Sequence, residues 1–294
     1  MANTRVTTPV TDFDKTNTTQ GLKLPSGTNS NQPAGVDAIQ GMLRNYTEET
    51  VDSSASALTH YNGTNWQYFA ATESRDPLPA NIKMYLDASD SSSYPGTGTT
   101  WFDLTDNDND ATLSGPTWNN AGYFEFNGSS NYGTIPHSND LNSSNSFSVE
   151  AWVNRDDDGD GSILRKETNA STQYGWHLVY GNGFFEGYQF KLWSNSNYPY
   201  IASAYQAGSG TAGDWQHVVG TFDGLYARIY VDGVFQRASV VWQGGTVSAN
   251  TTQVVLGSNY QLNYLFWDGK ISKTRIYDTA LSAAEIETLF TEGR

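Results

Sequence analysis

The chain has 294 residues, of which 37% are hydrophobic and 14% aromatic, enough for one sizeable domain and a smaller one. The formal net charge of -15 excludes a protein that binds nucleic acid, because such a surface needs clustered Lys and Arg. The absence of Cys excludes disulfides and thiolate metal sites. No apolar run approaches the roughly 20 residues that cross a bilayer, and the first residues lack the apolar core of a signal peptide, so we expect neither membrane insertion nor export.

Three segments of different composition come first in the chain. Residues 1–35 are polar and too poor in apolar side chains to fold alone, so we expect an extended attachment segment that becomes ordered against a partner. Residues 36–75 contain two strand-like runs and an Asn62-Gly63 turn, which predict a small β-hairpin module. Residues 76–81 contain two Pro and predict a linker.

Strand signals recur at short intervals over residues 82–294, between turns rich in Gly and Asn. In FSVEAWV, residues 147–153, the side chains alternate with the period of two that is typical of a strand. Asp232-Gly233 lies between two apolar runs and predicts a hairpin. Ser282 and Glu285 form a capping box at the start of LSAAEIETLF, which predicts a short C-terminal helix. We therefore expect an all-β antiparallel jelly-roll sandwich that ends in this helix.

The order of several separated motifs over residues 82–294 resembles the laminin-G-like, concanavalin A-like lectin/glucanase jelly roll. These motifs are YFEFNGSSNYGTIPHSNDLNSSNSFSVEAWV, DWQHVVGTFDGLYARIYVDG, VVLGS and FWDGKISKTRIYDTALSAAEIETLF. The opening LDASDSSSYPGTGTTWFDLTDNDNDATLSGPTW is similar to the variant of this domain found in bacteriophage structural proteins. LPSGTNSNQPAGVDAIQGMLRNYTEET and the following YNGTNWQYFA are similar to a hairpin module of phage tail fibre and virion proteins.

DDDGDGSILRKE, residues 156–167, matches a twelve-residue EF-hand calcium loop position by position. In an EF-hand the second half of the loop begins a helix, which brings the last Glu back to the ion. If SILRK is instead a strand, Glu167 lies roughly 13 Å beyond Ile163, at about 3.3 Å per residue, and cannot complete the same shell. The strand signals around this loop therefore argue against an EF-hand.

A calcium site between strands remains open for the same loop. Asp156, Asp158 and Asp160 could share Ca²⁺ with backbone carbonyls and water, since this ion accepts six to eight oxygens in loose geometry. The alternative is a solvated acidic turn. Residues 103–110 form a second acidic loop with the same two interpretations. Many relatives of the domain carry Asp directly after the Ile of the last long strand, where this chain has Ser272.

The motifs of the enzymes that share this fold are missing. Family glucanases carry E-x-D-x-x-E on one strand, because retaining hydrolysis needs two carboxylates roughly 5 to 5.5 Å apart. No such triplet occurs here, and Glu150 is followed two places on by Trp152, so we place Glu150 at the surface of the sheet. His217 in WQHVV matches a strand of the family in which the His is packed. We therefore expect a protein that is not an enzyme.

Aromatic residues among Asn, Ser and Gln mark two candidate sugar-binding stretches, because aromatic faces cover the apolar side of a sugar ring. The alternative is that these rings fill the core or a subunit interface. The candidates are Trp193, Tyr198 and Tyr200 in WSNSNYPY, and Tyr260 and Tyr264 in SNYQLNYLFW.

The resemblance implies a phage virion protein, part of a tail fibre or capsid-surface appendage that is made in the host cytoplasm. Its N-terminal segment would attach to other virion proteins, and the jelly roll would bind a host surface glycan or another partner. By analogy with fibres, we expect a homotrimer. The alternative is a free bacterial carbohydrate-binding module or a divergent glycan-degrading enzyme.

Overall fold

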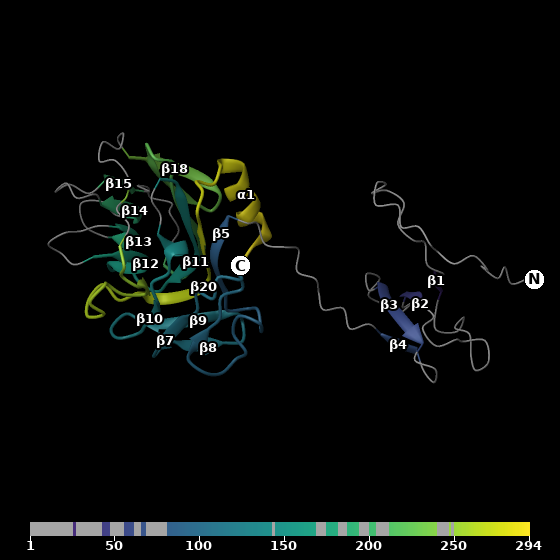
Figure 1. Ribbon diagram of the computed structural model, residues 1–294. Coiled ribbons are helices and arrows are strands. Elements are labelled where there is room, and N and C mark those ends of the chain that lie inside the picture. Colours follow the sequence, from purple (N-terminus) through teal and green to yellow (C-terminus); the bar gives the residue numbers. More distant parts are fainter. Residues whose placement is uncertain are drawn as a thin grey trace, which may run out of the picture. The chain divides into compact units, whose positions relative to one another are not determined.

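The computed structural model describes four short strands before residue 70, and then residues 81–142, 145–168, 175–181, 187–193, 200–203, 212–239, 247 and 250–294 (Figure 1). The chain divides into two compact units, Met1–Pro77 and Leu78–Arg294. The boundary between them lies inside the predicted linker, between its two prolines. Within the described residues, no helix is long and apolar enough to cross a membrane.

The N-terminal unit contains one small sheet, in the order β1-β2-β3-β4. Its strands are β1 (Ser26–Gly27), β2 (Leu43–Thr47), β3 (Ser56–Tyr61) and β4 (Trp66–Tyr68). β1 pairs with β2 in parallel, and the other pairs are antiparallel. The predicted Asn62-Gly63 turn falls in the sequence between β3 and β4 and lies outside the described residues. Apart from β1, the predicted attachment segment lies outside the described residues.

The C-terminal unit contains two eight-stranded antiparallel sheets. Sheet 1 has the order β15-β14-β13-β12-β19-β10-β7-β6, and sheet 2 has the order β18-β17-β16-β11-β20-β9-β8, with β5 also paired with β20. The strands of sheet 1 are β6 (Thr100–Trp101), β7 (Ala111–Ser114), β10 (Tyr132–Ile135), β12 (Gly161–Glu167), β13 (Gly175–Gly181), β14 (Gly187–Trp193), β15 (Tyr200–Ser203) and β19 (Val254–Leu256). Those of sheet 2 are β5 (Ile82–Asp87), β8 (Thr117–Asn119), β9 (Tyr123–Asn127), β11 (Phe147–Arg155), β16 (Trp215–Phe222), β17 (Ala227–Val231), β18 (Val234–Ala238) and β20 (Asp268–Tyr277).

The inner faces of the two sheets enclose one continuous hydrophobic core. Its members include Leu164, Leu178 and Phe190 from sheet 1 and Phe147 from sheet 2. Gly220 of β16 makes room for Phe190, because a Cβ atom there would lie 2.3 Å from Cγ of the Phe190 ring. The predicted all-β sandwich of the jelly-roll type is confirmed.

Besides the short 3-10 helix η3 (Asn139–Leu141), the described C-terminal unit has one α-helix, α1 (Ala283–Glu292), which covers part of the outer face of sheet 2. Ser282 and Glu285 form the predicted capping box. Ile286 is fully buried in a second hydrophobic cluster, and the Phe290 ring stacks on Trp152 of β11 with centroids 5.8 Å apart. The predicted C-terminal helix is therefore confirmed, and its apolar side closes over the outward residues of a central strand.

A strand, not a helix, follows the acidic loop. β12 (Gly161–Glu167) begins directly after Asp160 and runs to the position of the twelfth EF-hand residue. The predicted extended conformation, on which the rejection of an EF-hand depends, is confirmed.

Candidate functional site

The outer face of sheet 1 carries a row of side chains in register, all of them polar except one valine. Leu164, Leu178 and Phe190 pair across β12, β13 and β14 and point into the core. Their neighbours along the strands pair in the same way and therefore point outward, because successive side chains lie on opposite faces of a sheet. From β6 to β14 this outward row consists of Thr100, Thr112, Thr134, Val255, Arg165, His177 and Lys191.

Glu167 joins two members of this row through its carboxylate. Arg165 Nη1 donates to Glu167 Oε1 over 2.5 Å, and His177 Nε2 contacts the other oxygen, Oε2. Arg165 Nε also donates to the hydroxyl of Ser162 over 2.9 Å. The side chains are largely buried, with Arg165 only 2% exposed. The carboxylate thus fixes the orientation of a guanidinium and an imidazole side by side.

His177 is neutral at ordinary pH in this environment. Burial and the nearby charge of Arg165 lower the pKa of His177 to about 3, and the contact with Glu167 opposes this only in part. A neutral imidazole beside a carboxylate carries its proton on the nitrogen that faces the acid, here Nε2. Nδ1 of His177 is then a hydrogen-bond acceptor. The site therefore offers both donors and an acceptor.

Trp193 supplies an aromatic surface next to these polar groups. Its indole ring lies 4.2 Å from the imidazole of His177, between ring centroids, at an interplanar angle of 50°. Trp193 is the last residue of β14, and Gly175 separates it from Glu167 in the cross-strand register. We call Arg165, Glu167, His177, Lys191 and Trp193 the sheet-1 site.

A pocket of about 420 Å³ adjoins the sheet-1 site and shares Glu167 with it. Lys166 lies behind its wall, where the ammonium donates to the carbonyl of Thr252 over 2.5 Å and lies 3.2 Å from His137 Nδ1. The pocket is lined by Pro136, His137, Glu167, Thr251, Thr252, Gln253, Val255 and Tyr260. Polar groups and one aromatic ring therefore surround a space large enough for a sugar unit.

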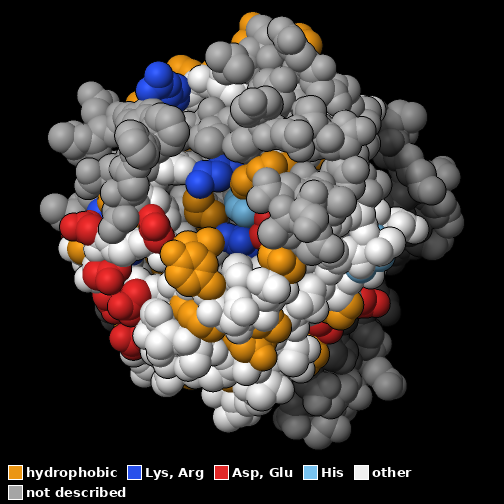
Figure 2. All heavy atoms as spheres, turned by 90° about the vertical axis from the view of Figure 1, so that its left-hand side faces the viewer, with side chains coloured by type: hydrophobic (Ala, Val, Ile, Leu, Met, Phe, Trp, Pro, Cys, Tyr) orange, Lys and Arg blue, Asp and Glu red, His pale blue; other side chains and the backbone are white. Residues whose placement is uncertain are grey.

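Figure 2 shows the molecule from the side on which β12 to β15 lie. A hollow on this face contains basic, histidine and acidic side chains close together, with hydrophobic side chains, an aromatic ring among them, at its border. A hollow with a few convergent polar groups and aromatic walls is typical of a ligand site.

Of the five predicted aromatic residues, two lie at the sheet-1 site or its adjoining pocket. Trp193 belongs to the sheet-1 site, and Tyr260 lines the adjoining pocket, so the structure brings these two distant stretches to one face. Tyr264 is 63% exposed, in a loop whose backbone amides bond to the side chain of Asn259. Tyr200 begins β15 and only its backbone is described, while Tyr198 lies outside the described residues.

The sequence reasoning missed the polar members of the site, Arg165, His177 and Lys191, and considered Glu167 only as a calcium ligand. A signal was present, because Arg165 and Glu167 stand two residues apart at the end of SILRKE, and Lys191 lies between Phe190 and Leu192 in QFKLW. Charged side chains at alternate positions of central strands mark an outward face with a possible ligand.

The three predicted calcium ligands lie beside the sheet-1 site but have protein partners of their own. Asp156 Oδ1 lies 2.6 Å from Lys270 Nζ, and Asp158 pairs with Arg155. Asp160 also takes part in an interaction of its own. Across the described residues, no group of three or more His, Asp or Glu side chains is arranged to hold a metal ion. Calcium at this loop stays a prediction.

Glu150 lies on the outer face of sheet 2, but it is not at the surface, and that expectation was wrong. It is 0% exposed, because α1 and its neighbours cover this face. Its carboxylate accepts hydrogen bonds from Arg275 over 3.0 and 3.3 Å, from Tyr277 over 2.7 Å, and lies 3.1 Å from His217 Nε2.

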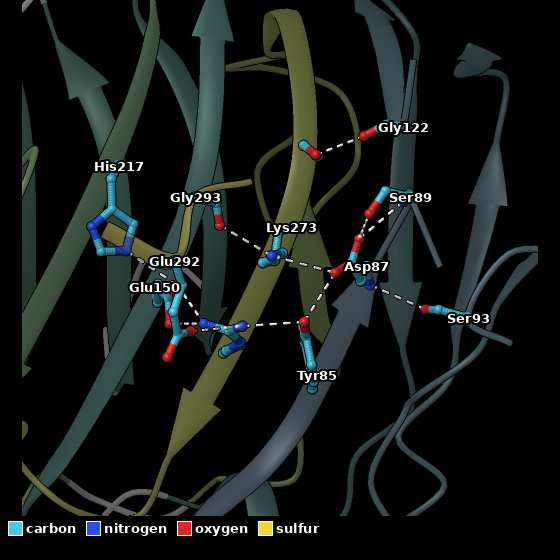
Figure 3. A network of polar contacts seen from close by, with 12 residues as sticks. Tyr85, Asp87, Ser89, Ser93, Gly122, Glu150, His217, Lys273, Glu292 and Gly293 are labelled. Atoms are coloured by element: carbon cyan, nitrogen blue, oxygen red, sulfur yellow. Dashed lines mark hydrogen bonds and ion pairs between the residues drawn. The ribbon is translucent and has the colours of Figure 1, made fainter. Parts of the chain in front are cut away.

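These partners keep Glu150 ionised. Burial alone would raise the pKa of Glu150, but the charge of Arg275 and the bond with His217 lower it to about 2. His217 is fully buried, so the prediction of a packed position is confirmed. Figure 3 shows the continuation of these contacts to Tyr85, Asp87 and Lys273, which lies between Asp87 and the carbonyl of Gly293. The arrangement is closed to substrate and ties α1 to the sheet.

The family can be identified from residues 127–287, which match the family model described as the concanavalin A-like lectin/glucanases superfamily. The match covers more than half of the chain. The chain belongs to this superfamily. No curated protein matches the sequence.

Solved structures with the same fold share little sequence with this superfamily member. The binding domain of Paraclostridial Mosquitocidal Protein 1 is 14% identical with a TM-score of 0.56 over 72% of this chain and 52% of that one. Domain 4 of AbnA, a GH43 extracellular arabinanase from Geobacillus stearothermophilus, in complex with arabinotriose, is 18% identical with a TM-score of 0.56 over 71% of this chain and 98% of that one. Trypanosoma rangeli sialidase in complex with sialic acid is 18% identical with a TM-score of 0.50 over 73% of this chain and 33% of that one. The chain thus spans about half the length of the toxin domain and a third of the sialidase, and at these identities the likeness concerns the fold.

Proposed function

We propose that the protein binds carbohydrate at the sheet-1 site and is not an enzyme. The observation that carries the proposal is the contact of Trp193 with His177, which Glu167 joins to a pocket of about 420 Å³. An indole face can cover the apolar side of a sugar ring, while imidazole, guanidinium and carboxylate groups bond its hydroxyls.

The names of similar structures support a binding role. One is the binding domain of a mosquitocidal protein, and another is an arabinanase domain in complex with arabinotriose. Each of these structures has little sequence in common with this chain, so the ligand of a similar structure is not assigned to this chain.

We propose further that the C-terminal unit is displayed on a phage virion, as part of a tail fibre or capsid-surface appendage. The support is the resemblance of the N-terminal stretches to phage virion modules and the separation of the chain into two units. The N-terminal unit would attach to other virion proteins, and by analogy with fibres the protein would form a homotrimer. Imaging of virions labelled on the C-terminal unit tests this, because the absence of label on particles contradicts it.

The second candidate is a carbohydrate-binding module of a bacterial glycan-degrading enzyme. It is favoured by the fold likeness to domain 4 of AbnA, which this chain matches over 98% of that domain's length. The virion protein and the enzyme module would both bind carbohydrate at the sheet-1 site. They differ in the partner to which the N-terminal unit attaches the domain.

A glycan array with matched variants tests the shared proposal. The wild type should bind a subset of glycans, and Trp193→Ala should abolish this binding. Trp215→Ala is the control, since Trp215 lies on β16 of sheet 2. Thermal unfolding of each variant shows whether it remains folded. Equal binding by Trp193→Ala and the wild type, or no binding by the wild type to any glycan, would contradict the proposal.

A further inference from the structure

Basic groups outnumber acidic ones at the sheet-1 site. Arg165 and Lys191 flank His177 in the outward row, and Lys166 lies behind the wall of the adjoining pocket. Glu167 is the single carboxylate within the site, and Asp160 acts on Lys191 from the neighbouring acidic loop. Since His177 is neutral, two cations, Arg165 and Lys191, lie beside the one carboxylate of the site. This contrasts with the protein as a whole, which carries a net charge of -15.

Arg165 and Lys191 each carry hydrogen-bond donors that have no acceptor among the described residues. Arg165 Nη2 is buried and has no hydrogen-bond partner among the described residues, although Nη1 and Nε of the same guanidinium are bonded. Lys191 makes no hydrogen bond or ion pair within that part of the chain, although it is half-buried in the middle of a central strand. A buried cation without a full set of partners is costly, which indicates that something else completes its coordination.

Burial lowers the pKa of both lysines of this region. Burial first, and then the charge of Arg165, lowers the pKa of Lys191 in spite of Asp160 and Glu167. Burial lowers the pKa of Lys166 to about 8. Arg165 adds to the effect of burial on Lys191, and an anion placed beside these two cations would be stabilised by both.

We propose that the sheet-1 site takes an acidic saccharide, a sugar unit that carries a carboxylate or a sulfate group. Arg165 Nη2 and the ammonium of Lys191 would hold the anionic group, while the Trp193 ring covers the sugar and His177 Nδ1 accepts from a hydroxyl. An Arg fork suits both kinds of oxyanion, so the shared chemistry is the negative charge, and the experiment separates the two. This inference rests on the proposed carbohydrate-binding function.

The test compares sugars that differ only in the acidic group, with saturation-transfer NMR and the full-length chain. The pairs are glucuronate with glucose, galacturonate with galactose, and N-acetylglucosamine 6-sulfate with N-acetylglucosamine. Each acidic sugar should bind at least about tenfold more tightly than its neutral partner. One or two hydrogen bonds to a charged group contribute about this much to the affinity. The pair with the larger ratio identifies carboxylate or sulfate as the preferred group. Added NaCl should reduce this preference, because salt screens charges.

Matched variants locate the effect. Lys191→Gln should reduce binding of the acidic sugars about tenfold while binding of the neutral partners changes little. Lys83→Gln is the control, since Lys83 lies on β5 of sheet 2, where it pairs with Asp278 over 2.9 Å. Equal affinity for acidic and neutral partners would overturn this inference and leave carbohydrate binding intact. Failure of every sugar here and on the glycan array would overturn both. Binding of inorganic sulfate as tight as that of the sulfated sugar would show a plain anion site and overturn the inference.

Discussion

The indole ring of Trp193 and the imidazole ring of His177 lie 4.2 Å apart, on neighbouring strands of the same sheet. The imidazole nitrogen Nε2 bonds Glu167, whose second oxygen bonds Arg165. One aromatic surface is thereby linked to three polar groups by contacts that fix their orientation. The burial and low pKa of His177 follow from this arrangement and give the first prediction.

Stability should fall as the pH drops from about 6.5. The pKa of His177 is about 3 in the folded chain, against an ordinary value of 6.5, so the unfolded chain takes up its proton first. The stabilisation present above pH 6.5 is therefore lost progressively as the pH falls toward 3, by a few kcal/mol at about 1.4 kcal/mol per unit. Urea unfolding at several pH values measures how the free energy of unfolding changes with pH. His177→Gln should make this change smaller at pH values above those at which ordinary carboxyl groups titrate.

His137 provides the control for this pH dependence. Burial and the charge of Lys166 also lower the pKa of His137, but it lies near the surface, so His137→Gln should remove less of the slope. The dependence of the free energy of unfolding on pH could instead stay unchanged in His177→Gln and disappear in His137→Gln. That result would show that His177 has an ordinary pKa.

Tyr277→Phe should lower the free energy of unfolding by about 1.5 to 3 kcal/mol, because it removes one hydrogen bond to a buried carboxylate. Tyr277 donates to Glu150 Oε2 over 2.7 Å, beneath α1. Tyr94→Phe is the matched control, since its hydroxyl donates over 2.9 Å to the neutral carbonyl of Gly98, and it should cost about 0.5 to 1.5 kcal/mol. Chemical denaturation measures both, and an equal cost would mean that the Glu150 charge adds nothing.

Gly220→Ala should destabilise the sandwich by about 1 to 3 kcal/mol through overpacking. The added Cβ would meet the Phe190 ring of the facing sheet at 2.3 Å. Phe190→Leu is itself destabilising, but it should relieve part of the cost of Gly220→Ala, so the two changes together should cost less than their sum. Additive costs in this double-mutant cycle would contradict the contact.

The calcium prediction for the acidic loop is tested by thermal unfolding with Ca²⁺ and with chelator. If Asp156, Asp158 and Asp160 share the ion, the midpoint should rise with Ca²⁺, by the equivalent of about 2.7 kcal/mol at about 100 times the dissociation constant. Asp158→Asn together with Asp160→Asn should remove the response, and Asp140→Asn, outside the loop, should keep it. Because Asp156 and Asp158 already pair with Lys270 and Arg155, an unchanged midpoint in the wild type would identify a plain acidic turn.

Local patterns explain why much of the fold could be predicted from the sequence. The alternation in residues 147–153 became β11, and the capping box at Ser282 became the start of α1. The burial of Glu150 could not be predicted in the same way. Its outward direction follows from the alternation, but the cover over it comes from α1, far along the chain. Alternation predicts which face a side chain lies on and not what packs against that face.

The sheet-1 site depends on register, which the sequence does not specify. The pairing of β12 with β13 shifts between Ser162 and Leu164, so Ile163 and Leu164 are both buried and Arg165 points outward. Without this bulge, the period of two would assign the following residues to the opposite faces. Trp193 of the site and Tyr260 of the adjoining pocket could be found from composition, whereas their polar neighbours required three strands in register.

The most direct test of carbohydrate binding on the outer face of sheet 1 is NMR mapping of the saccharide that the array identifies. Titration should shift the backbone and side-chain resonances of Arg165, His177 and Lys191, together with the indole signal of Trp193, and should leave the strands of sheet 2 unchanged. Shifts confined to sheet 2, for example to its exposed strand β18, with those of β12 to β14 unmoved, would contradict the assignment of the site.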